Sequence, residues 1–542
     1  MKRLTTLILL SAVLAAAGSC AKNQPIFPDN PGGKEVTPDP PTPPVKVVDY
    51  DKYAMGVLAL EAGVRLGVSF TYWEYRQNTA VQNILKRDFT AVTFGNEMKH
   101  DAIVQSDGRY NFASADEMAG WADACGNDLF GHTLGWHSQQ RRDYLDAVIS
   151  KAVPNNDASL LQKNWNLEEG TLDGFVADGF KVISSLYDVF AGEYAAKAVS
   201  DGASLQMDAA IEAGKAYDVS FWAKTLDAEG SVKIVSGDGQ EAETPVSKSW
   251  NKFSVTIPVK AAGEFSYRLV ASKDVVIDNI RVIGADGSSP SASFRTGNDL
   301  GGELVNDAIG FVYRDWVYTM VEHFDVYGWD VVNETFSDWP VEFRNTQNTD
   351  VSKNFVWGHY FKSTKDWVDK AFAYATDALA RSGKTAILYL NDYNLETIDA
   401  KRKAYCDYVK GNPQVTGVGT QMHLDMSTQD LKDKIVACLK DLTATGRMVR
   451  ISELDIKCTD LAAQADLYKF IFQQYLAIVP EAQRGGITIW GINDKDSWVR
   501  QEQDGKQNMP LLYQGDNYAR KPAWETLYLY FCELAGLDPY KE

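Results

Sequence analysis

The sequence has few cysteines, no concentration of positive charge, and no long apolar run beyond its N-terminus. Only six of the 542 residues are cysteine and none forms a CxxC pair, so neither a zinc site nor a disulfide framework is predicted. Lys and Arg (54) are outnumbered by Asp and Glu (73), which gives a net charge of −19 without a strongly basic segment. We therefore expect no nucleic-acid partner. After the first twenty residues no apolar run is long enough to predict a membrane-spanning helix.

The chain is long and rich in aromatic residues. A hydrophobic fraction of 45% and a charged fraction of 23% are ordinary for a folded protein. A chain of 542 residues predicts roughly two to four domains, because a single core rarely grows so large. The aromatic fraction of 12% suits a protein that stacks on flat, neutral ligands such as sugars, although composition alone does not choose among them.

The first twenty residues are typical of a targeting signal. Two basic residues precede a largely apolar run over 4–17, and small residues then lead to Cys20; the run is too short to span a bilayer. The arrangement resembles a bacterial lipoprotein signal, which implies lipidation at Cys20. Ala17 stands where such signals usually have Leu, so ordinary secretion is the alternative. We expect a lipid anchor in the outer membrane at the cell surface, with a periplasmic orientation left open.

After residue 45, short apolar runs rich in β-formers alternate with amphipathic helical stretches. Continuous apolar strands separated by helices predict a parallel sheet covered on both faces. Eight such units predict an α/β fold, the (β/α)8 TIM barrel, whose active site lies where the strands end. A doubly wound open sheet is the alternative. The eight runs cover residues 64–68, 89–94, 128–134, 329–332, 385–390, 417–422, 448–451 and 486–490.

Almost two hundred residues separate the third run from the fourth, too many for one helical connection. Short alternating strands at 216–224, 250–257 and 275–282, joined by Gly and Asp turns, predict an all-β sandwich inserted after the third strand. Before the barrel, eight prolines predict an extended tether. The predicted parts are a signal peptide (1–20), a tether (21–44), a barrel (45–153 and 301–542) and an inserted sandwich (154–300).

Two glutamates follow predicted barrel strands. Glu334 ends the fourth run, and Glu453 lies just beyond the seventh. Carboxylates facing each other across a cleft are what glycoside cleavage needs, one to protonate the leaving oxygen and one to attack or to activate water. A salt-bridged loop residue is the alternative for either glutamate alone.

The stretches around these glutamates, Asp-Val-Val-Asn-Glu at 330–334 and Ile-Ser-Glu-Leu-Asp-Ile at 451–456, resemble the catalytic signatures of glycoside hydrolase family 10, the retaining endo-β-1,4-xylanases. Five further stretches resemble family motifs and occur in family order. They are residues 93–99, 131–139, 391–394, 417–424 and 490–498. The resemblance implies xylan and xylo-oligosaccharides as substrates, with no cofactor and no metal.

The resemblance also implies roles for individual residues. Glu334 would be the acid/base, with a pKa raised by burial and by the second carboxylate. Asn333 would bond the sugar 2-hydroxyl. Glu453 would be the ionised nucleophile, with His423 and Asp455 as its supports. Such a pair should lie about 5–5.5 Å apart and retain the anomeric configuration.

Other matched positions would contact sugar through polar groups or flat rings. The hydroxyl-binding candidates are Asn96, Lys99, His132, Gln139 and Gln421, and the aromatic candidates are Trp136, Trp490, Trp498 and Tyr393. His137 and Asp494 would at least hold neighbours in place. The chain departs from the family at Gly95, where a glutamate is usual, and at His100, where a tryptophan is usual. Glu97 cannot be assumed to replace the missing glutamate.

The predicted insert resembles carbohydrate-binding modules of families 4 and 22, in the stretches 164–170, 219–224 and 276–282. These stretches mark the sandwich framework more than a binding face, and we expect Trp165, Phe221 and Trp222 in its core. Tyr187, Phe190 and Tyr194 are the candidates for stacking. We expect the module to bind xylan, and a structural insert without a ligand is the alternative.

Two other functions fit the sequence. One is a hydrolase of the same fold that prefers another β-1,4-glycan, such as mixed-linkage glucan. The other is a surface protein that captures glycan without cleaving it, against which the presence of both carboxylates argues. The sequence carries no signal for oligomerisation, and we expect a monomer.

Overall fold

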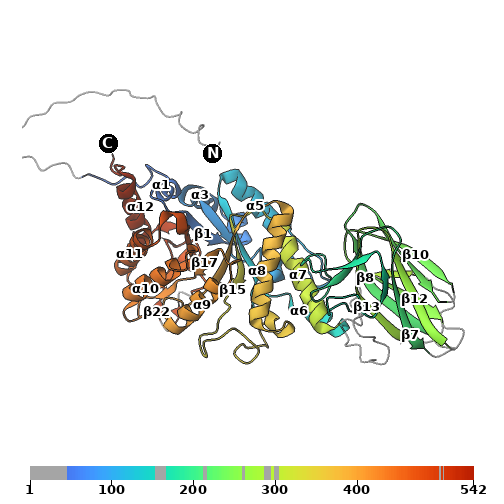
Figure 1. The fold of residues 1–542 in the computed structure, drawn as a ribbon. Coiled ribbons are helices and arrows are strands. Elements are labelled where there is room, and N and C mark those ends of the chain that lie inside the picture. The colour runs from blue at the N-terminus through green and yellow to red at the C-terminus, as the bar shows by residue number, and fades with distance from the viewer. Residues whose placement is uncertain are drawn as a thin grey trace, which may run out of the picture. The chain divides into compact units, whose positions relative to one another are not determined.

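Eight parallel strands close into a ring (Figure 1). The computed structural model describes residues 46–541 except 153–165, 212–215, 238, 259–262, 286–293, 298–303, 500–501 and 504–505. The strands pair in the order β1, β2, β3, β15, β16, β17, β19 and β20, and β20 returns to β1. The predicted (β/α)8 barrel is confirmed, and the open sheet is excluded. The ring strands are β1 (Leu66–Phe70), β2 (Ala91–Phe94), β3 (Asp128–Gly135), β15 (Gly328–Asn333), β16 (Ile387–Asp392), β17 (Gly417–Thr420), β19 (Met448–Lys457) and β20 (Arg484–Ile489).

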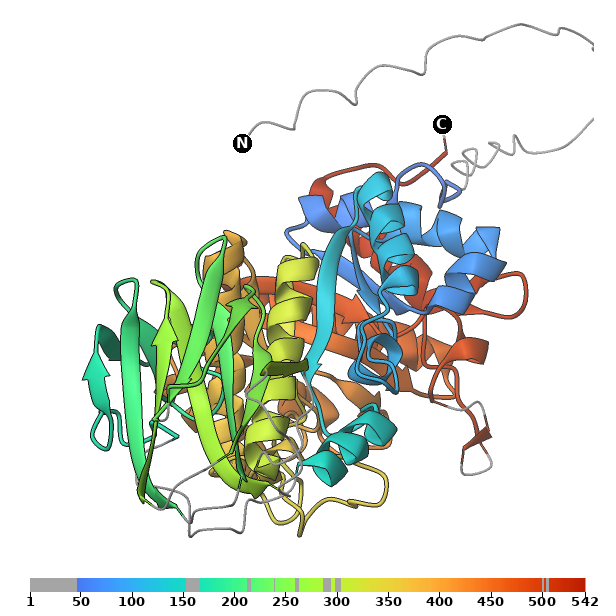
Figure 2. The same ribbon diagram turned by 90° about the vertical axis from the view of Figure 1, so that its right-hand side faces the viewer.

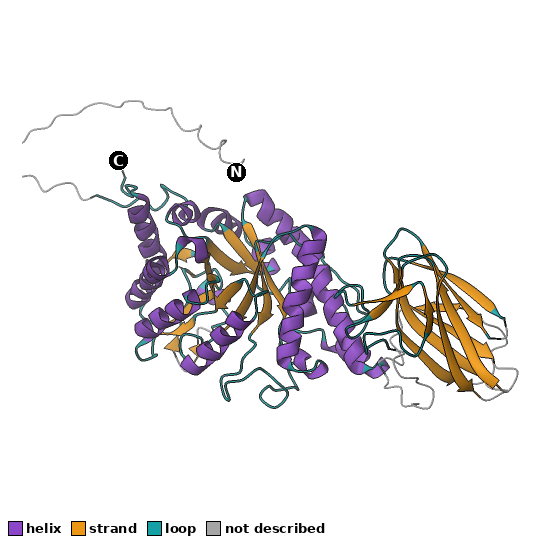
Figure 3. Ribbon diagram, viewed as in Figure 1, coloured by secondary structure: helices purple, strands orange, loops and turns teal. Residues whose placement is uncertain are grey.

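Helices cover the outside of this ring (Figure 3). In α8 the Ser363 side chain accepts a hydrogen bond from the N–H of Asp366, and Gly383 ends the helix with φ +69°, a left-handed conformation that glycine adopts without strain. The helices are α1 (Met55–Glu61), α2 (Tyr72–Gln77), α3 (Thr79–Asp88), α4 (His100–Ile103), α5 (Ala113–Cys125), α6 (Arg142–Lys151), α7 (Val305–His323), α8 (Thr364–Ser382), α9 (Asp399–Gly411), α10 (Leu431–Thr443), α11 (Leu461–Ile478) and α12 (Pro522–Ala535), with 3-10 turns η1 (Trp357–Tyr360), η2 (Glu481–Gln483) and η3 (Asp494–Asp496).

Large side chains fill the interior of the ring. Tyr389 is fully buried there, and the Arg450 guanidinium lies 3.4 Å from the centroid of the Phe130 ring. On the outer face of the strands, Trp329 is fully buried against Phe324, and Gly131 makes room for it, because a Cβ at position 131 would lie 2.1 Å from the indole. The ring is therefore a packed core, and a ligand must bind at its ends.

Antiparallel strands occupy the chain between α6 and α7 (Figure 2). They form a sheet of order β10-β9-β12-β7-β4 and a sheet of order β14-β11-β8-β13-β6-β5. Leu205 and Leu269 from the first sheet share one buried cluster with Val219 and Ile277 from the second. The strands are β4 (Val176–Asp178), β5 (Phe180–Ile183), β6 (Ala195–Ala198), β7 (Ala203–Ile211), β8 (Ala216–Thr225), β9 (Gly230–Ser236), β10 (Glu241–Val246), β11 (Asn251–Pro258), β12 (Gly263–Ala271), β13 (Val275–Ala285) and β14 (Phe294–Gly297).

Short strands complete the described chain. β18 (His423–Asp425) pairs in parallel with β19, and the other short strands form two hairpins. The hairpin strands are β21 (Glu502–Gln503), β22 (Lys506–Gln507), β23 (Tyr513–Gln514) and β24 (Ala519–Arg520). Asp49–Pro539 forms one compact unit.

Several predictions concern residues outside the described ones. Cys20, Trp165, the signal peptide, the tether and the exact limits of the insert fall there, so they stay predictions. Within residues 46–541, gaps aside, no helix combines the length and hydropathy needed to cross a bilayer.

Candidate active site

A cavity of about 720 Å³ opens at the carboxyl ends of the ring strands. Parallel strands deliver their C-terminal residues to one face of a barrel, so polar side chains far apart in the sequence converge there. Asp455 lies behind the cavity wall, bonded to His423. The wall contains all the other predicted catalytic, supporting and sugar-binding residues: Asn96, Lys99, His132, Trp136, Gln139, Asn333, Glu334, Tyr393, Gln421, His423, Glu453, Trp490 and Trp498.

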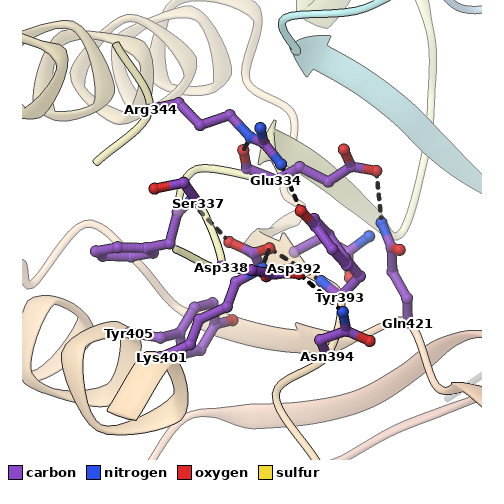
Figure 4. Close-up of polar contacts among 12 residues, drawn as sticks. Glu334, Ser337, Asp338, Arg344, Asp392, Tyr393, Asn394, Lys401, Tyr405 and Gln421 are labelled. Atoms are coloured by element: carbon purple, nitrogen blue, oxygen red, sulfur yellow. Dashed lines mark hydrogen bonds and ion pairs between the residues drawn. The ribbon is translucent and has the colours of Figure 1, made fainter. Parts of the chain in front are cut away.

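Glu334 follows the last residue of β15 and is held on both its backbone and its side chain (Figure 4). Its backbone is left-handed, with φ +57°, and its N–H donates to the carbonyl of Asn391 at 2.8 Å. Arg344 Nε donates to its carbonyl oxygen at 2.8 Å. Gln421 Nε2 donates to Oε1 at 3.2 Å, and His137 Nε2 lies 3.7 Å from Oε2. These contacts aim the carboxyl group into the cavity.

The surroundings of Glu334 favour its protonated form. Burial raises the pKa of Glu334, and the charge of Arg344 only partly opposes this. Burial, with Arg344 and Lys401, lowers the pKa of His137 to about 3, so this imidazole is neutral and adds no positive charge. A carboxyl group in such a place keeps its proton to a higher pH than an exposed glutamate does and is suited to donate it.

Glu453 has the opposite environment. It is 5% exposed, and its Oε1 accepts from Asn391 Nδ2 at 2.9 Å while Oε2 lies 3.2 Å from His423 Nε2. Burial alone would raise the pKa of Glu453, but the hydrogen bond from His423 and the positive charges of His423 and Lys99 lower it overall. Glu453 is therefore a carboxylate held ionised.

His423 is held charged by two carboxylates. Its Nδ1 lies 2.8 Å from Asp455 Oδ2, and the register of β18 with β19 places the two residues opposite each other. Burial opposes the charge, but Asp455 and Glu453 outweigh it and raise the pKa of His423 to about 10. Trp498 Nε1 donates to the same Asp455 oxygen at 2.7 Å. Successive odd residues of a strand share a face, which brings Glu453 and Asp455 to one imidazole.

One hydrogen-bond network joins the two glutamates. Asn391 Nδ2 donates to Glu453 and, at 2.9 Å, to Asn333 Oδ1. Gln421 Nε2 donates to Glu334 and, at 3.3 Å, to the same Asn333 oxygen. The side-chain oxygen of Asn333 thus accepts hydrogen bonds from two amide groups, and its side-chain NH2 group can donate to a ligand.

A second polar group lies after β2 and β3. Lys99 Nζ donates to Gln139 Oε1 at 2.6 Å and to Asn96 Oδ1 at 3.4 Å, and it lies 5.0 Å from the Trp136 ring centroid. Burial lowers the pKa of Lys99. Amide, ammonium and indole groups in one wall match the hydroxyls and the apolar faces of a sugar.

Three more rings border the cavity. Trp490 lies 5.3 Å from the ring of His132, whose Nδ1 is 2.9 Å from Asp330 Oδ2. Trp498 is 61% exposed and offers a wide face. Tyr393 is oriented by Arg344, whose Nη2 donates to the phenol oxygen at 2.6 Å (Figure 4). Among the described residues no group of three or more His, Cys, Asp or Glu is arranged to hold a metal.

Comparison with known proteins identifies the fold's family. The family model described as glycosyl hydrolase family 10 matches residues 55–164 and 301–529, which leaves out the whole β4–β14 segment. The chain belongs to this family.

Family 10 relatives of known activity match about two fifths of the chain. Endo-beta-1,4-xylanase Xyn10C of Cellvibrio japonicus is 33% identical over 241 residues, which covers 38% of this chain and 37% of that protein. The endo-1,4-beta-xylanase of Geobacillus stearothermophilus is 28% identical over 237 residues, 40% of this chain and 66% of that protein. This chain thus spans little more than a third of the first relative.

Solved family 10 structures share the fold. Native xylanase 10C of Cellvibrio japonicus aligns with a TM-score of 0.52 and 20% identity, covering 91% of this chain and 76% of that one. Xylanase 10B of Thermotoga petrophila RKU-1, in complex with xylobiose, aligns with a TM-score of 0.51 and 20% identity, covering 90% and 99%.

The departures from the family pattern have visible consequences in this family 10 barrel. Glu97 does not border the cavity, because its carboxylate accepts hydrogen bonds from the N–H groups of Tyr72 and Asn96. It therefore does not replace a side chain at Gly95. His100 is 3% exposed and packs on Trp316 at 5.0 Å, which makes it a structural residue.

Sequence reasoning gave no role to several residues of the site. Asn391, which contacts Glu453, stood in a family-like stretch at the end of a strand, and that place was a usable signal. Arg344 lies in the loop after β15, where no pattern points to it. Asp494, expected to hold a neighbour in place, pairs with Lys521 at 2.9 Å and anchors the loop after β20.

Proposed function

We propose that this protein is an endo-acting, retaining β-1,4-xylanase. The observation that carries the proposal is that one cavity wall holds two carboxyl groups in opposite surroundings, Glu334 beside neutral partners and Glu453 bonded to His423. The pKa of Glu334 is raised and that of Glu453 is lowered. Pairs of carboxyl groups driven apart in this way are typical of an acid and a nucleophile.

The proposed reaction has two steps. Glu453 Oε attacks the anomeric carbon as Glu334 gives its proton to the departing glycosidic oxygen, so the C–O bond to the leaving sugar breaks and a glycosyl ester forms. Glu334, now ionised, then takes a proton from water, whose oxygen attacks the same carbon and releases Glu453. Two inversions give net retention. The hydrogen bond from His423 stabilises Glu453 as both nucleophile and leaving group.

Xylan and xylo-oligosaccharides are the proposed substrates. The support comes from the relatives, several of which are named endo-1,4-beta-xylanases, and from the sugar-binding chemistry of the cavity wall. The Asn333 amide is the proposed partner of the 2-hydroxyl at the reacting sugar. The reaction requires neither metal nor organic cofactor, and a monomer suffices.

The test uses the protein from residue 45 onward with linear xylo-oligosaccharides and follows the anomeric proton of the new reducing end by NMR. Internal cleavage with β product appearing first is expected, and the Glu453→Gln protein should release none. Initial α product would contradict the double displacement. Cleavage of cello-oligosaccharides alone would change the substrate to another β-1,4-glycan, and binding without cleavage would favour glycan capture.

We also propose that the β4–β14 segment is a carbohydrate-binding module that takes xylan. Its two-sheet architecture supports this, while Phe190 is withdrawn as a stacking candidate because it is 1% exposed and lies 3.9 Å from the Trp222 ring. Tyr187 is half-buried, with Arg381 3.4 Å and Lys224 3.8 Å from its ring centroid, so half-buried Tyr194 is the candidate to test. With cleavage disabled by Glu453→Gln, Tyr194→Ala should weaken retention on insoluble xylan, and unchanged retention would contradict its role.

The proposed location is the outer membrane, through a lipid on Cys20 and a proline-rich tether. The signal-like N-terminal sequence supports this. In cells fed a labelled fatty acid, the protein should carry the label and Cys20→Ala should not. Protease treatment of intact cells then separates a surface orientation from a periplasmic one, and absence of label would favour ordinary secretion.

A further inference from the structure

One corner of the cavity contains the carboxyl group of Glu74, which has no role in the proposed reaction. The corner is formed by Thr71, Glu74 and Gly95. Thr71 and Glu74 follow β1, and Gly95 follows β2. Because glycine has no side chain, the strand end at β2 leaves space in the wall here.

The Glu74 carboxyl group is fixed next to that space. Its Oε2 accepts hydrogen bonds from the N–H and the hydroxyl of Thr71, at 2.7 and 2.8 Å. A Cβ on Gly95 would point at the same threonine, 3.2 Å from its Cγ2. Glu74 and a side chain at position 95 would therefore both lie against Thr71 in the cavity wall, and no donor among the described residues bonds Oε1 of Glu74. Burial raises the pKa of Glu74, as expected for a carboxyl group withdrawn from water.

The order of strands places this corner on one side of the reacting centre. In the ring of eight, β1 stands four strands from β16 and so lies opposite it. Tyr393 and Asn394 follow β16 and line the other end of the cavity beside Glu334. The acid protonates the leaving group, so the leaving sugar lies toward Glu334 and the β1 end receives the retained sugars.

We infer that Glu74 binds a hydroxyl of the retained sugar one unit removed from the bond that is cleaved, supplying from α2 the acceptor that Gly95 does not supply from β2. This rests on the proposed xylanase function and names a substrate contact within it. The ligand is a neutral pentose unit in β-1,4 linkage.

Glu74 also has a structural role, which the experiment must separate. Thr71 and Glu74 form a capping box at the start of α2, and a box of this kind accepts Gln in place of Glu. Glu74→Gln therefore preserves the helix end but removes the charged acceptor. Glu117→Gln is the matched control, because Glu117 accepts from Tyr72 and Arg76 of the same helix and lies outside the cavity wall.

The test compares kcat/KM for an aryl β-xyloside, which offers one retained sugar, with that for the aryl β-xylobioside, which offers two. Glu74→Gln should lower the value for the xylobioside about 10-fold or more, the loss of a charge-assisted hydrogen bond, and should leave the xyloside within about 2-fold. Glu117→Gln should change neither. Equal losses on both substrates would show a structural role and overturn the inference, as would no loss on either.

A second variant separates loss of the proposed sugar contact from misfolding of α2. Gly95 is outside the left-handed region and its neighbour Thr71 needs to move only a few tenths of an ångström, so Gly95→Glu is tolerable. Combined with Glu74→Ala it should recover most of the xylobioside activity that Glu74→Ala loses, and failure to recover would count against a shared site. Wild-type protein inactive on xylobioside and xylo-oligosaccharides alike would refute the proposed function itself, and the inference with it.

Discussion

Asp455→Asn should lower the pKa of His423 and weaken the folded state in a pH-dependent way. In the wild type, Asp455 and Glu453 together raise the pKa of this imidazole to about 10 from an ordinary 6.5. Asparagine keeps the shape and can still accept from Trp498, but it removes one of the two negative charges. The His423 pKa should then fall by at least about 1 unit.

The magnitude follows from the shift. A raised pKa in the folded state stabilises the protein fully below the unfolded value, near 6.5, and this contribution is lost as the pH rises through the folded value. The interval of roughly 3.5 units corresponds to about 5 kcal/mol at about 1.4 kcal/mol per unit. Asp455 supplies a large share, so the variant should lose on the order of 2 kcal/mol at pH 6, and the two proteins should converge toward pH 10.

The assay combines two measurements. The C2 proton of His423 is followed by NMR, which is practicable because the chain has six histidines, and urea unfolding midpoints are recorded from pH 6 to 10. Asp425→Asn is the control, since Asp425 lies on the same short strand as His423 but faces Lys457. An unchanged His423 titration in Asp455→Asn would refute the assigned electrostatics, as would a stability difference that grows with pH.

The remaining predictions concern the acid, the nucleophile and the barrel core. Glu334→Gln should lower kcat on xylan about 100-fold or more, but should lower kcat on aryl xylobiosides with good leaving groups far less. Glu453→Gln should abolish activity on both substrates. An equal loss of kcat on the two substrates in Glu334→Gln would contradict the role of Glu334 as acid. The reaction needs Glu334 in its protonated form, and burial raises the pKa of Glu334. The value of kcat/KM should therefore fall as the pH rises through that pKa. In Glu334→Gln, assayed on substrates with good leaving groups, this fall at alkaline pH should be absent. Gly131→Ala should cost about 2 kcal/mol or more by urea unfolding, because its Cβ would collide with Trp329. Gly120→Ala, with open space and a helical backbone, should be neutral or stabilising, and equal midpoints for both would contradict the packing argument.

The barrel could be predicted from sequence because its strands are buried on both sides and read as continuous apolar runs. The pattern fails where the strands become functional. The fifth run was predicted at 385–390, but β16 is Ile387–Asp392, and the seventh was predicted to end at 451, but β19 continues to Lys457. Each strand continues into polar residues such as Asn391 and Glu453, which hydrophobicity cannot mark as strand.

The site could be predicted as far as it lies at strand ends. Glu334 and Glu453 carry both a positional signal and a family-like motif. Arg344 and Glu74 carry neither, because one lies in a long loop and the other in a short helix, and only folding brings them to the cavity. The hydrogen bond between His423 and Asp455 depends on the register of β18 against β19. This register cannot be predicted from the hydrophobic pattern of a single sequence.

The left-handed backbone of Glu334 has a consequence for selection. At φ +57° a glutamate costs about 1–3 kcal/mol that Gly or Asn would largely avoid. Variants chosen for heat resistance at this position would therefore tend to be the ones that cannot donate a proton. A thermal screen of this protein should therefore keep Glu334 fixed, since stability and proton donation favour different residues at this position.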